Sequence, residues 1–503
     1  MKFIYHKYDE LPRLSWCAII EKDKEDIDVY CGPWVETLDD FFEEGAWDDE
    51  FEKANFDNSV FFMGSGAKLV NNSVIFSTPN HTLERLHVIR EKNKIFISNS
   101  LAFVLEKSNK DLDIDYTGYE KDFATILKGI NEYKSQIFLK DGQHLELYYY
   151  CNIVIDNQLK IKKEKKKQRE DFIDFNDYYS SLKNCLKSLH KNLSSNKRKI
   201  NYGVVTTISK GYDSIACAAL GKEIGCNLAV TLNRPGKYEE DDGTDIAKIL
   251  GYEKILGKDA NEYMNRTDFV EAEFLASGEL GTGIVFSSFE KEFQQNMVLT
   301  GVNGDLFWGR INDYVNREIK YENESIASTT LYENRLRVGF VNVPIPFYGA
   351  FNWPSIHKIS NSEEMKKWSV GDQYDKPIPR RIIEEKGVPR SAFGRKKSGA
   401  GFNYQFDNLN RIRTRMSPSS FKSFYKFYKE NKSTKRLIKN YKNIMKYILY
   451  TFPIYCNYLF KKMRVKFRFK EDRERLVSNP FAPAFLIHWG IYITRDRYNI
   501  RKI

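Results

Sequence analysis

Two short polar segments, each with glycine and a single aspartate, follow apolar runs in the sequence. The first is 209–214 (SKGYDS), and the second is 300–305 (TGVNGD). Glycine lets a backbone come close to an anion, and the free N–H groups at the start of a helix attract phosphate. An aspartate repels a bare phosphate. Asp213 in the first segment therefore predicts a Mg²⁺ ion between its carboxylate and the phosphate oxygens.

The elements around these segments alternate between strands and helices from about residue 176. Strands are expected at 200–208, 227–232, 254–256 and 297–301, and helices at 213–225 and 244–250. Such alternation predicts an α/β fold in which a parallel sheet carries helices on both faces. Ligands of these sheets bind at the carboxyl ends of the strands, and both aspartates follow predicted strands.

Both segments resemble motifs of one superfamily. The spacing S-x-G-x-D-S resembles the pyrophosphate-binding loop of the ATP-pyrophosphatase superfamily, usually S-G-G-x-D-S, and differs from the Walker loop. The second segment resembles S-G-E-G-A-D-E-L-F-G-G of asparagine synthetases and β-lactam synthetases. The resemblance implies a HUP-like domain that binds ATP and Mg²⁺ and adenylates a carboxylate. Lys210 stands where the superfamily has glycine, and Val302 stands where the family has glutamate.

The resemblance also implies a nucleotide site and a metal site, residue by residue. The residues expected to bind the nucleotide are Ser209, Lys210, Gly211, Asp213, Ser214, Leu232, Thr300 and Gly301. Among them, Leu232 and Gly301 are expected to meet adenine through the backbone. Asp213 and Asp305 are expected to hold Mg²⁺ on the triphosphate.

Two further segments supply candidate catalytic residues by the same resemblance. The segment 331–340 (LYENRLRVGF) resembles E-x-R-V-P-F, which aligns Glu333 and Arg335. The glutamate of the family handles the proton of the attacking amine. The segment 389–402 resembles R-x-K-x-G-F, whose lysine stabilises the charge that develops as the acyl-adenylate forms. Lys397 is the expected counterpart, with Lys396 as the alternate.

Residues 1–160 are β-rich in pattern, with short apolar runs separated by turn residues. The segment 82–104 resembles the glutamine amidotransferase sandwich of asparagine synthetases. The nucleophile of that domain is a cysteine at position 2, whereas this chain has Lys2, with neither thiol nor hydroxyl. We therefore predict a degenerate domain without glutaminase activity. The acceptor is then free ammonia or, more in keeping with this loss, an amine on a second substrate.

The predicted organisation has four parts: an amidotransferase-like domain at 1–160, a linker at 161–175, an ATP-binding domain at 176–410 and a basic, aromatic, helical extension at 411–503. The linker is inferred from the charged run 160–169, which cannot pack in a core. In the extension, 444–460 is too short and interrupted to span a bilayer. A buried helix and peripheral membrane contact, aided by the basic residues that follow, are the two interpretations.

Composition narrows the partners and the compartment. The 503 residues carry a net charge of +11, which favours anionic partners such as nucleotides. The seven cysteines are dispersed and lack CxxC spacing, which predicts a reducing compartment with neither disulfides nor a zinc site. The first residues do not resemble a signal peptide, so we expect a cytoplasmic protein.

Two other functions fit the same sequence. One is an ATP pyrophosphatase that modifies tRNA or closes a ring within one substrate, for which the basic extension is suited. The other is a catalytically inactive scaffold that binds a nucleotide, which Lys210, Val302 and the missing nucleophile favour. The patterns specify neither the carboxylate, nor the amine, nor the oligomeric state.

Overall fold

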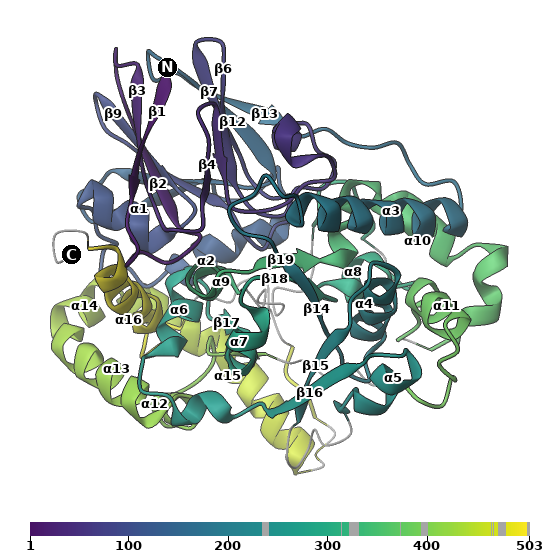
Figure 1. Cartoon of the computed structure of the whole chain (residues 1–503). Helices are drawn as coiled ribbons and strands as arrows, with labels where there is room; N and C mark the ends of the chain where they lie inside the picture. The colour runs from purple at the N-terminus through teal and green to yellow at the C-terminus, as the bar shows by residue number, and fades with distance from the viewer. Residues whose placement is uncertain are drawn as a thin grey trace.

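The computed structural model describes residues 1–233, 241–312, 314–320, 331–372, 374–393, 401–463, 465, 467–470 and 479–499. It is a mixed α/β structure (Figure 1). A seven-stranded and a six-stranded sheet come from the first third of the chain, a five-stranded parallel sheet follows, and the last part is helical.

The two larger sheets face each other and share an apolar core. The seven-stranded sheet has the order β1-β3-β2-β9-β8-β11-β10, and the six-stranded sheet has the order β13-β12-β7-β6-β5-β4. Trp16 and Val88 of the first sheet pack with Phe42, Phe76 and Ile153 of the second. The strands are β1 (Lys2–Lys7), β2 (Trp16–Glu21), β3 (Asp26–Cys31), β4 (Glu36–Thr37), β5 (Phe41–Glu43), β6 (Gly66–Val70), β7 (Ser73–Ser77), β8 (Leu86–Arg90), β9 (Lys94–Ser98), β10 (Gln136–Phe138), β11 (His144–Tyr148), β12 (Cys151–Asp156) and β13 (Ile161–Lys165).

The basic run at 160–169 is not the exposed linker that its composition predicts. Residues Ile161–Lys165 form β13, which pairs with β12 at the edge of the six-stranded sheet. An edge strand needs a partner on one side only, so its lysines remain in solvent while the backbone is paired. Lys166, the next residue, is buried, with its ammonium 5.0 Å from the centre of the Phe62 ring.

The five-stranded sheet is parallel throughout, with the order β16-β15-β14-β18-β19. Its strands are β14 (Gly203–Thr207), β15 (Leu228–Asn233), β16 (Lys254–Asp259), β18 (Asn296–Thr300) and β19 (Val341–Pro344). Side chains of β18 alternate between two apolar cores: Met297 and Leu299 face one, and Val298 faces the other. Both faces of the sheet are therefore covered, as alternating strands and helices predict.

Helices of this region occupy both cores. α3 (Phe175–Leu193), α4 (Tyr212–Glu223), α5 (Thr244–Ile249), α8 (Gly304–Phe307), α10 (Trp353–Ser360) and α11 (Pro377–Glu385) contribute to the first core, and α6 (Val270–Ala276), α7 (Glu290–Phe293) and α9 (Tyr332–Val338) to the second. Thr244 is the first helical residue of α5. The Oδ1 atom of Asp242 accepts the hydrogen bond from the Thr244 amide, at 2.9 Å.

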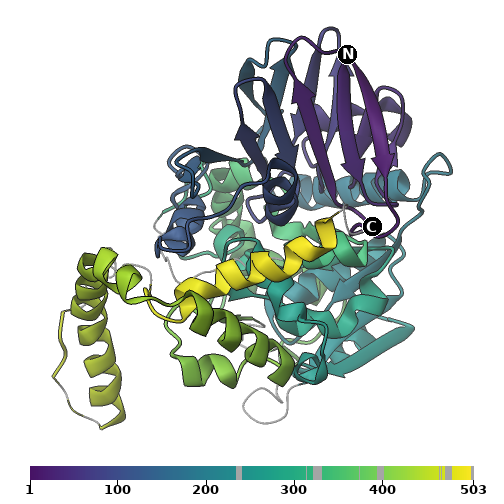
Figure 2. The same ribbon diagram turned by 90° about the vertical axis from the view of Figure 1, so that its left-hand side faces the viewer.

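The C-terminal helices divide into a packed and a projecting group. They are α12 (Leu409–Arg413), α13 (Pro418–Asn431), α14 (Thr434–Lys439), α15 (Tyr441–Lys462) and α16 (Pro483–Arg495). α16 lies so close to α6 that a Cβ on Gly490 would be 2.9 Å from the Ala272 oxygen. Figure 2 shows α16 crossing the body toward the N-terminal sheets, while α15 stands away from it. No helix within the described residues is long and apolar enough to cross a membrane.

Buried ion pairs join the N-terminal sheets to the parallel-sheet region. The guanidinium of Arg335, in α9, lies 2.6 Å from a carboxylate oxygen of Glu44 and 2.7 Å from one of Glu84. Arg198, which precedes β14, lies 2.8 Å from Glu43. All of these side chains are almost fully buried, so each charge depends on its partner across the boundary.

Replacement of Arg335 by alanine should destabilise the protein strongly, because it leaves the Glu44 and Glu84 carboxylates buried without a counter-charge. We expect a loss of about 3–5 kcal/mol in the free energy of unfolding. Arg317→Ala is the control, because its ion pair with Asp171 is about half exposed, and should cost less than about 1 kcal/mol. Urea denaturation followed by fluorescence measures both, and equal losses would contradict the role assigned to Arg335.

Candidate functional site

Asp213 and Asp305 come together beyond the ends of two neighbouring parallel strands. Asp213 lies in the first turn of α4, which follows β14, and Asp305 lies in the first turn of α8, which follows β18. The Nζ atom of Lys376 is 2.6 Å from Oδ2 of Asp213 and also contacts Oδ1 of Asp305. Lys376 precedes the first residue of α11. Three helix starts from distant parts of the chain thus converge at one point.

The charges in this cluster are interdependent: Lys376 is buried, while 16% of the Asp213 side chain and 31% of the Asp305 side chain are exposed. Burial raises the pKa of Asp213 to about 6; the ammonium of Lys376 opposes this shift, and the charge of Asp305 adds to it. Burial alone would lower the pKa of Lys376, but the two carboxylates outweigh it and hold that pKa above its ordinary value. Oδ1 of Asp213 is buried and accepts no hydrogen bond from the described residues. It faces Gly304, on which an added Cβ would lie 2.3 Å from it.

Two glycines of the second segment make the close approach of Asp213 sterically feasible. A Cβ built on Gly304 would lie 2.2 Å from Cγ of Asp213, and one built on Gly301 would lie 2.8 Å from its Cβ. Both distances are shorter than non-bonded carbons tolerate. Gly301 and Gly304 therefore leave room for Asp213, which lies in α4 after the neighbouring strand β14, in addition to any contact they make with a ligand.

The expected phosphate loop is closed by its own hydrogen bonds. The hydroxyl oxygens of Ser209 and Ser214 are 2.9 Å apart, and the Gly211 amide donates to the Ser209 hydroxyl at 3.1 Å. The Lys210 amide donates to the carbonyl of Asp241 at 3.3 Å. A phosphate would have to replace these internal contacts in order to use the same hydroxyls and amides.

The other residues expected to meet the nucleotide lie at the same edge of the sheet. Thr300 is the last residue of β18, and Gly301 follows it against Asp213. Leu232 is the second-last residue of β15, the neighbour of β14 on the other side. The resemblance thus selects positions that the strand order gathers along one edge.

Lys376 was not predicted from the sequence, although its position carries a signal. A cation at the start of a helix is disfavoured by the helix dipole, so such a lysine indicates a nearby acid. The preceding Asp375 fixes its loop: the carboxylate accepts from the amides of Val370 and Gly371, each at 3.1 Å. The Asp375 carbonyl accepts from the Arg310 amide at 3.0 Å, which ties this loop to the segment after α8.

Lys396 and Lys397 lie outside the described residues. The described residues on either side of them are anchored near the cluster. The Phe393 ring lies 5.4 Å from the ring of Tyr212, the neighbour of Asp213. On the other side, β20 (Phe402–Asn403) pairs with β17 (Gly281–Thr282). β17 lies within the segment 278–283 (GELGTG), so this segment pairs with the one that follows the two lysines.

Glu333 occupies a junction of three chain segments. Its Oε1 accepts from the hydroxyl of Ser100, which caps α1 (Leu101–Ser108), at 2.5 Å, and its Oε2 accepts from Tyr498 at 2.7 Å. Burial raises the pKa of Glu333 to about 7, although these two hydrogen bonds act against the shift. Its described hydrogen bonds therefore link α9 to α1 and to the C-terminal residues.

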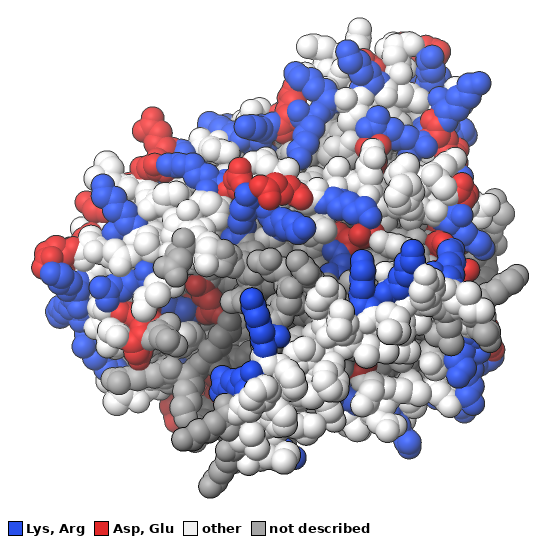
Figure 3. All heavy atoms as spheres, turned by 180° about the vertical axis from the view of Figure 1, so that it is seen from behind, with Lys and Arg blue, Asp and Glu red and all other residues white. Residues whose placement is uncertain are grey.

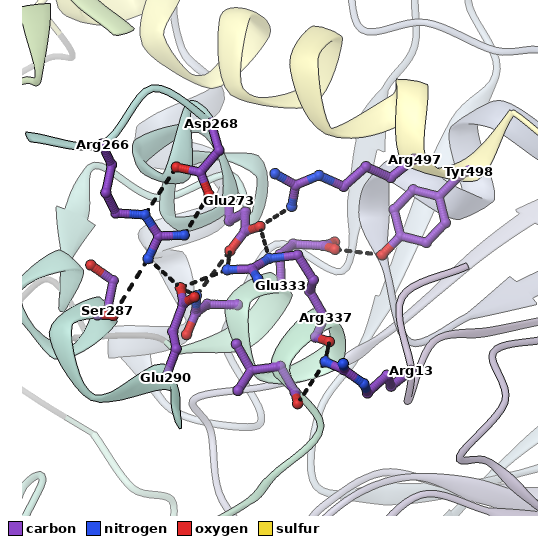
Figure 4. Close-up of polar contacts among 12 residues, drawn as sticks. Arg13, Arg266, Asp268, Glu273, Ser287, Glu290, Glu333, Arg337, Arg497 and Tyr498 are labelled. Carbon is purple, nitrogen blue, oxygen red and sulfur yellow. Dashed lines mark hydrogen bonds and ion pairs between the residues drawn. The ribbon is translucent and has the colours of Figure 1, made fainter. Parts of the chain in front are cut away.

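Beside Glu333, a cluster of arginines and acids holds the C-terminal residues in place (Figure 4). Arg337 and Arg497 both contact the buried carboxylate of Glu273. Arg266 and Arg337 reach Glu290 at 2.9 and 2.6 Å. The arginines face acids at short range, so the charges are largely balanced within the protein. This arrangement fits a structural junction better than an anion-binding site.

No protein-family model matches the chain, and no curated protein matches it. The likeness to asparagine synthetases therefore rests on the motifs and on the chemistry of the residues that meet at the sheet edge.

Gly304→Ala should destabilise the protein by about 1–3 kcal/mol, because the added methyl group overlaps the Asp213 carboxyl and forces apart a packed contact. Gly211→Ala is the matched control, since its Cβ would have an ordinary 3.4 Å contact with Ser209. We expect the control to cost less than about 1 kcal/mol. Thermal unfolding of both variants compares the two positions, and a harmless alanine at 304 would argue against the tight approach.

Glu333→Gln should change how stability depends on pH. Between the ordinary glutamate pKa and about 7, folded protein retains a proton that the unfolded chain has lost, so the stabilising effect of this proton is lost as pH rises. The variant lacks this loss, at most about 1.4 kcal/mol per pH unit. Its stability relative to wild type should therefore rise from pH 5 to about 7 and then level off. A constant difference in urea midpoints would refute the assignment.

Proposed function

We propose that the protein binds ATP with Mg²⁺ and adenylates a substrate carboxylate with release of pyrophosphate, after which ammonia or an amine attacks to give an amide. One observation carries the proposal. Two aspartates that follow adjacent parallel strands meet on the buried ammonium of Lys376, where each keeps part of its side chain exposed, and Oδ1 of Asp213 has no hydrogen-bond partner among described residues. Such a point at the carboxyl edge of a parallel sheet is where a metal–nucleotide would bind.

The residues of the cluster fit a Mg²⁺ ion chemically. Carboxylate oxygens of Asp213 and Asp305 are the hard ligands that this ion prefers, and it commonly takes its remaining ligands from phosphates and water. Within the described ranges no group of three or more metal-ligating side chains occurs, which agrees with a site completed by a substrate. When bound, the ion would supply charge neutralisation at the phosphate oxygens.

Other residues of the chain would bind and orient the phosphates. The hydroxyls of Ser209 and Ser214 and the amide of Gly211 can turn from their mutual contacts to phosphate oxygens. Lys376 balances the two aspartates and carries a cation able to donate to a phosphate oxygen. Positioning and fixed charge of this kind account for most of the acceleration that enzymes achieve in such reactions.

The later steps are assigned to residues identified by the resemblance. Lys397, or Lys396 in its place, would stabilise the negative charge that develops between carboxylate and α-phosphate. Glu333 would take the proton of the attacking amine, a role for which a pKa near 7 is suited. In the present form its carboxylate is held by Ser100 and Tyr498, so this role requires that one hydrogen bond be exchanged.

The nitrogen source is proposed to be external. Lys2 is exposed at the edge of the seven-stranded sheet, with its ammonium 3.4 Å from Asp26. Cys17 is buried in β2, and burial raises the pKa of its thiol to about 12, which disfavours a nucleophilic thiolate. The two N-terminal sheets would then stabilise the parallel-sheet region through their ion pairs with it, and would not hydrolyse glutamine.

Asp213→Asn tests the proposal directly. The amide keeps the shape of the side chain but removes the charge that would hold the cation, so Mg²⁺-dependent ATP binding should be lost in calorimetry. ATP–pyrophosphate exchange, screened with pools of carboxylates, should fall about 10²–10³-fold. Asp259→Asn is the matched control, because Asp259 also ends a strand of this sheet but is exposed. Normal exchange in the Asp213 variant would overturn the site.

A second candidate function is a nucleotide-binding scaffold without catalysis. The specific observation in its favour is Lys376, whose ammonium already occupies the space between the two aspartates. A permanent lysine there would replace the metal ion. Wild-type protein that binds ATP equally with and without Mg²⁺, and that releases no pyrophosphate with any carboxylate pool, would favour the scaffold.

A further inference from the structure

The net positive charge of the chain is concentrated in one segment. Residues 431–470, here called the basic arm, contain twelve Lys and Arg residues and no Asp or Glu. The rest of the chain then has 67 basic and 68 acidic residues, which is close to neutral. The +11 of the whole protein therefore belongs to the arm. It includes α14 and the 22-residue helix α15.

α15 exposes a row of large apolar side chains on one side. No residue of this helix is buried. The most exposed apolar side chains are Tyr441, Met445, Ile448, Leu449, Phe452, Tyr455 and Tyr458, with 48–64% of each in solvent. Their spacing of mostly three or four residues brings them onto one side of the helix. Exposed apolar patches of this extent on soluble proteins generally mark a site of interaction.

The segment that follows α15 packs against part of the helix. The side chain of Asn457 donates to the Phe469 carbonyl at 2.9 Å and accepts from its amide at 2.7 Å. The ring of Phe460 lies 6.0 Å from those of Phe467 and Phe469. The helix and its return segment thus support each other, and Phe452 of the exposed row shares in this contact, with its ring 6.2 Å from that of Phe469. In Figure 3, basic side chains are spread over the face turned to the viewer, with acidic side chains among them.

We propose that the basic arm docks on an anionic lipid surface, with α15 lying in the plane of the membrane interface and its exposed row inserted among the acyl chains. Exposed lysines at both ends of the helix, Lys442 at its start and Lys461 and Lys462 at its end, would meet lipid phosphates, while tyrosines and phenylalanines suit the boundary between headgroups and acyl chains. The helix is about 33 Å long at 1.5 Å per residue, but it contains Lys446 and Pro453. These residues favour an interfacial orientation.

Other occupants fit the same surface less well. A nucleic acid would neutralise the lysines but would leave Met445, Ile448 and Leu449 without apolar contacts. A second copy of the chain would cover the apolar row but would bring a second arm with the same positive charge, and the rest of each copy is nearly neutral. An anionic bilayer satisfies both features at once, and this inference does not depend on the proposed function.

Co-sedimentation of the full-length protein with vesicles tests the proposal. We expect binding to vesicles of phosphatidylcholine with phosphatidylglycerol, and little binding to phosphatidylcholine alone. The double variant Leu449→Asp/Phe452→Asp should reduce the partition coefficient about tenfold or more, because both side chains lose their transfer into the acyl region. The matched control Phe138→Asp/Ile173→Asp changes two apolar residues elsewhere that are, as a pair, at least as exposed as Leu449 and Phe452. It should bind the anionic vesicles within about twofold of wild type.

Three results would overturn the proposal. The first is equal binding of the double variant and wild type to anionic vesicles, with circular dichroism confirming that both are folded. The second is retention on tRNA, unchanged by the double variant and without vesicle binding, which indicates a nucleic-acid partner. The third is a concentration-dependent dimer that the double variant abolishes, again without vesicle binding. ATP binding is measured on the same variants. If it is unchanged in all of them, failure of the membrane proposal is distinguished from failure of the proposed function.

Discussion

Two negative charges at the ends of neighbouring strands are the constraint on which the site depends. Without a counter-charge, Asp213 and Asp305 would repel each other in a buried environment where such repulsion is weakly screened. Lys376 relieves this repulsion, and its loop is fixed in turn by Asp375 and Arg310. The position of α11 is thus coupled to the charges of Asp213 and Asp305, which follow β14 and β18.

The N-terminal ends of α4, α8 and α11, which meet at this point, differ in electrostatic character. Asp213 and Asp305 lie in first turns, where the helix dipole stabilises a negative charge, whereas Lys376 lies where the dipole disfavours a positive one. A local conflict of this kind is retained only when another interaction compensates for it. Functional sites are where such conflicts are expected, because a ligand supplies part of the compensation.

Local sequence patterns could predict much of the parallel-sheet region. The alternation of apolar runs and helical periods gave four of its five strands to within a few residues but missed β19, and the strand order explains why Asp213 and Asp305 meet. Lys376 could not be found in this way, since 163 residues separate it from Asp213. Ser100 and Tyr498, the partners of Glu333, lie 233 and 165 residues from it. β13 was missed because the charge of its lysines concealed the backbone pairing of an edge strand.

The ion pairs of Arg335 have a consequence for dissection of the protein. Domains of this size often fold when expressed alone. Here, a fragment that begins after β13 would retain Arg335 but lose Glu44 and Glu84, and it would expose the surface of α9 that they cover. The fragment with the two sheets alone would hold both glutamates without a cation. Neither half is chemically complete, so the chain should unfold as one cooperative unit rather than in two stages.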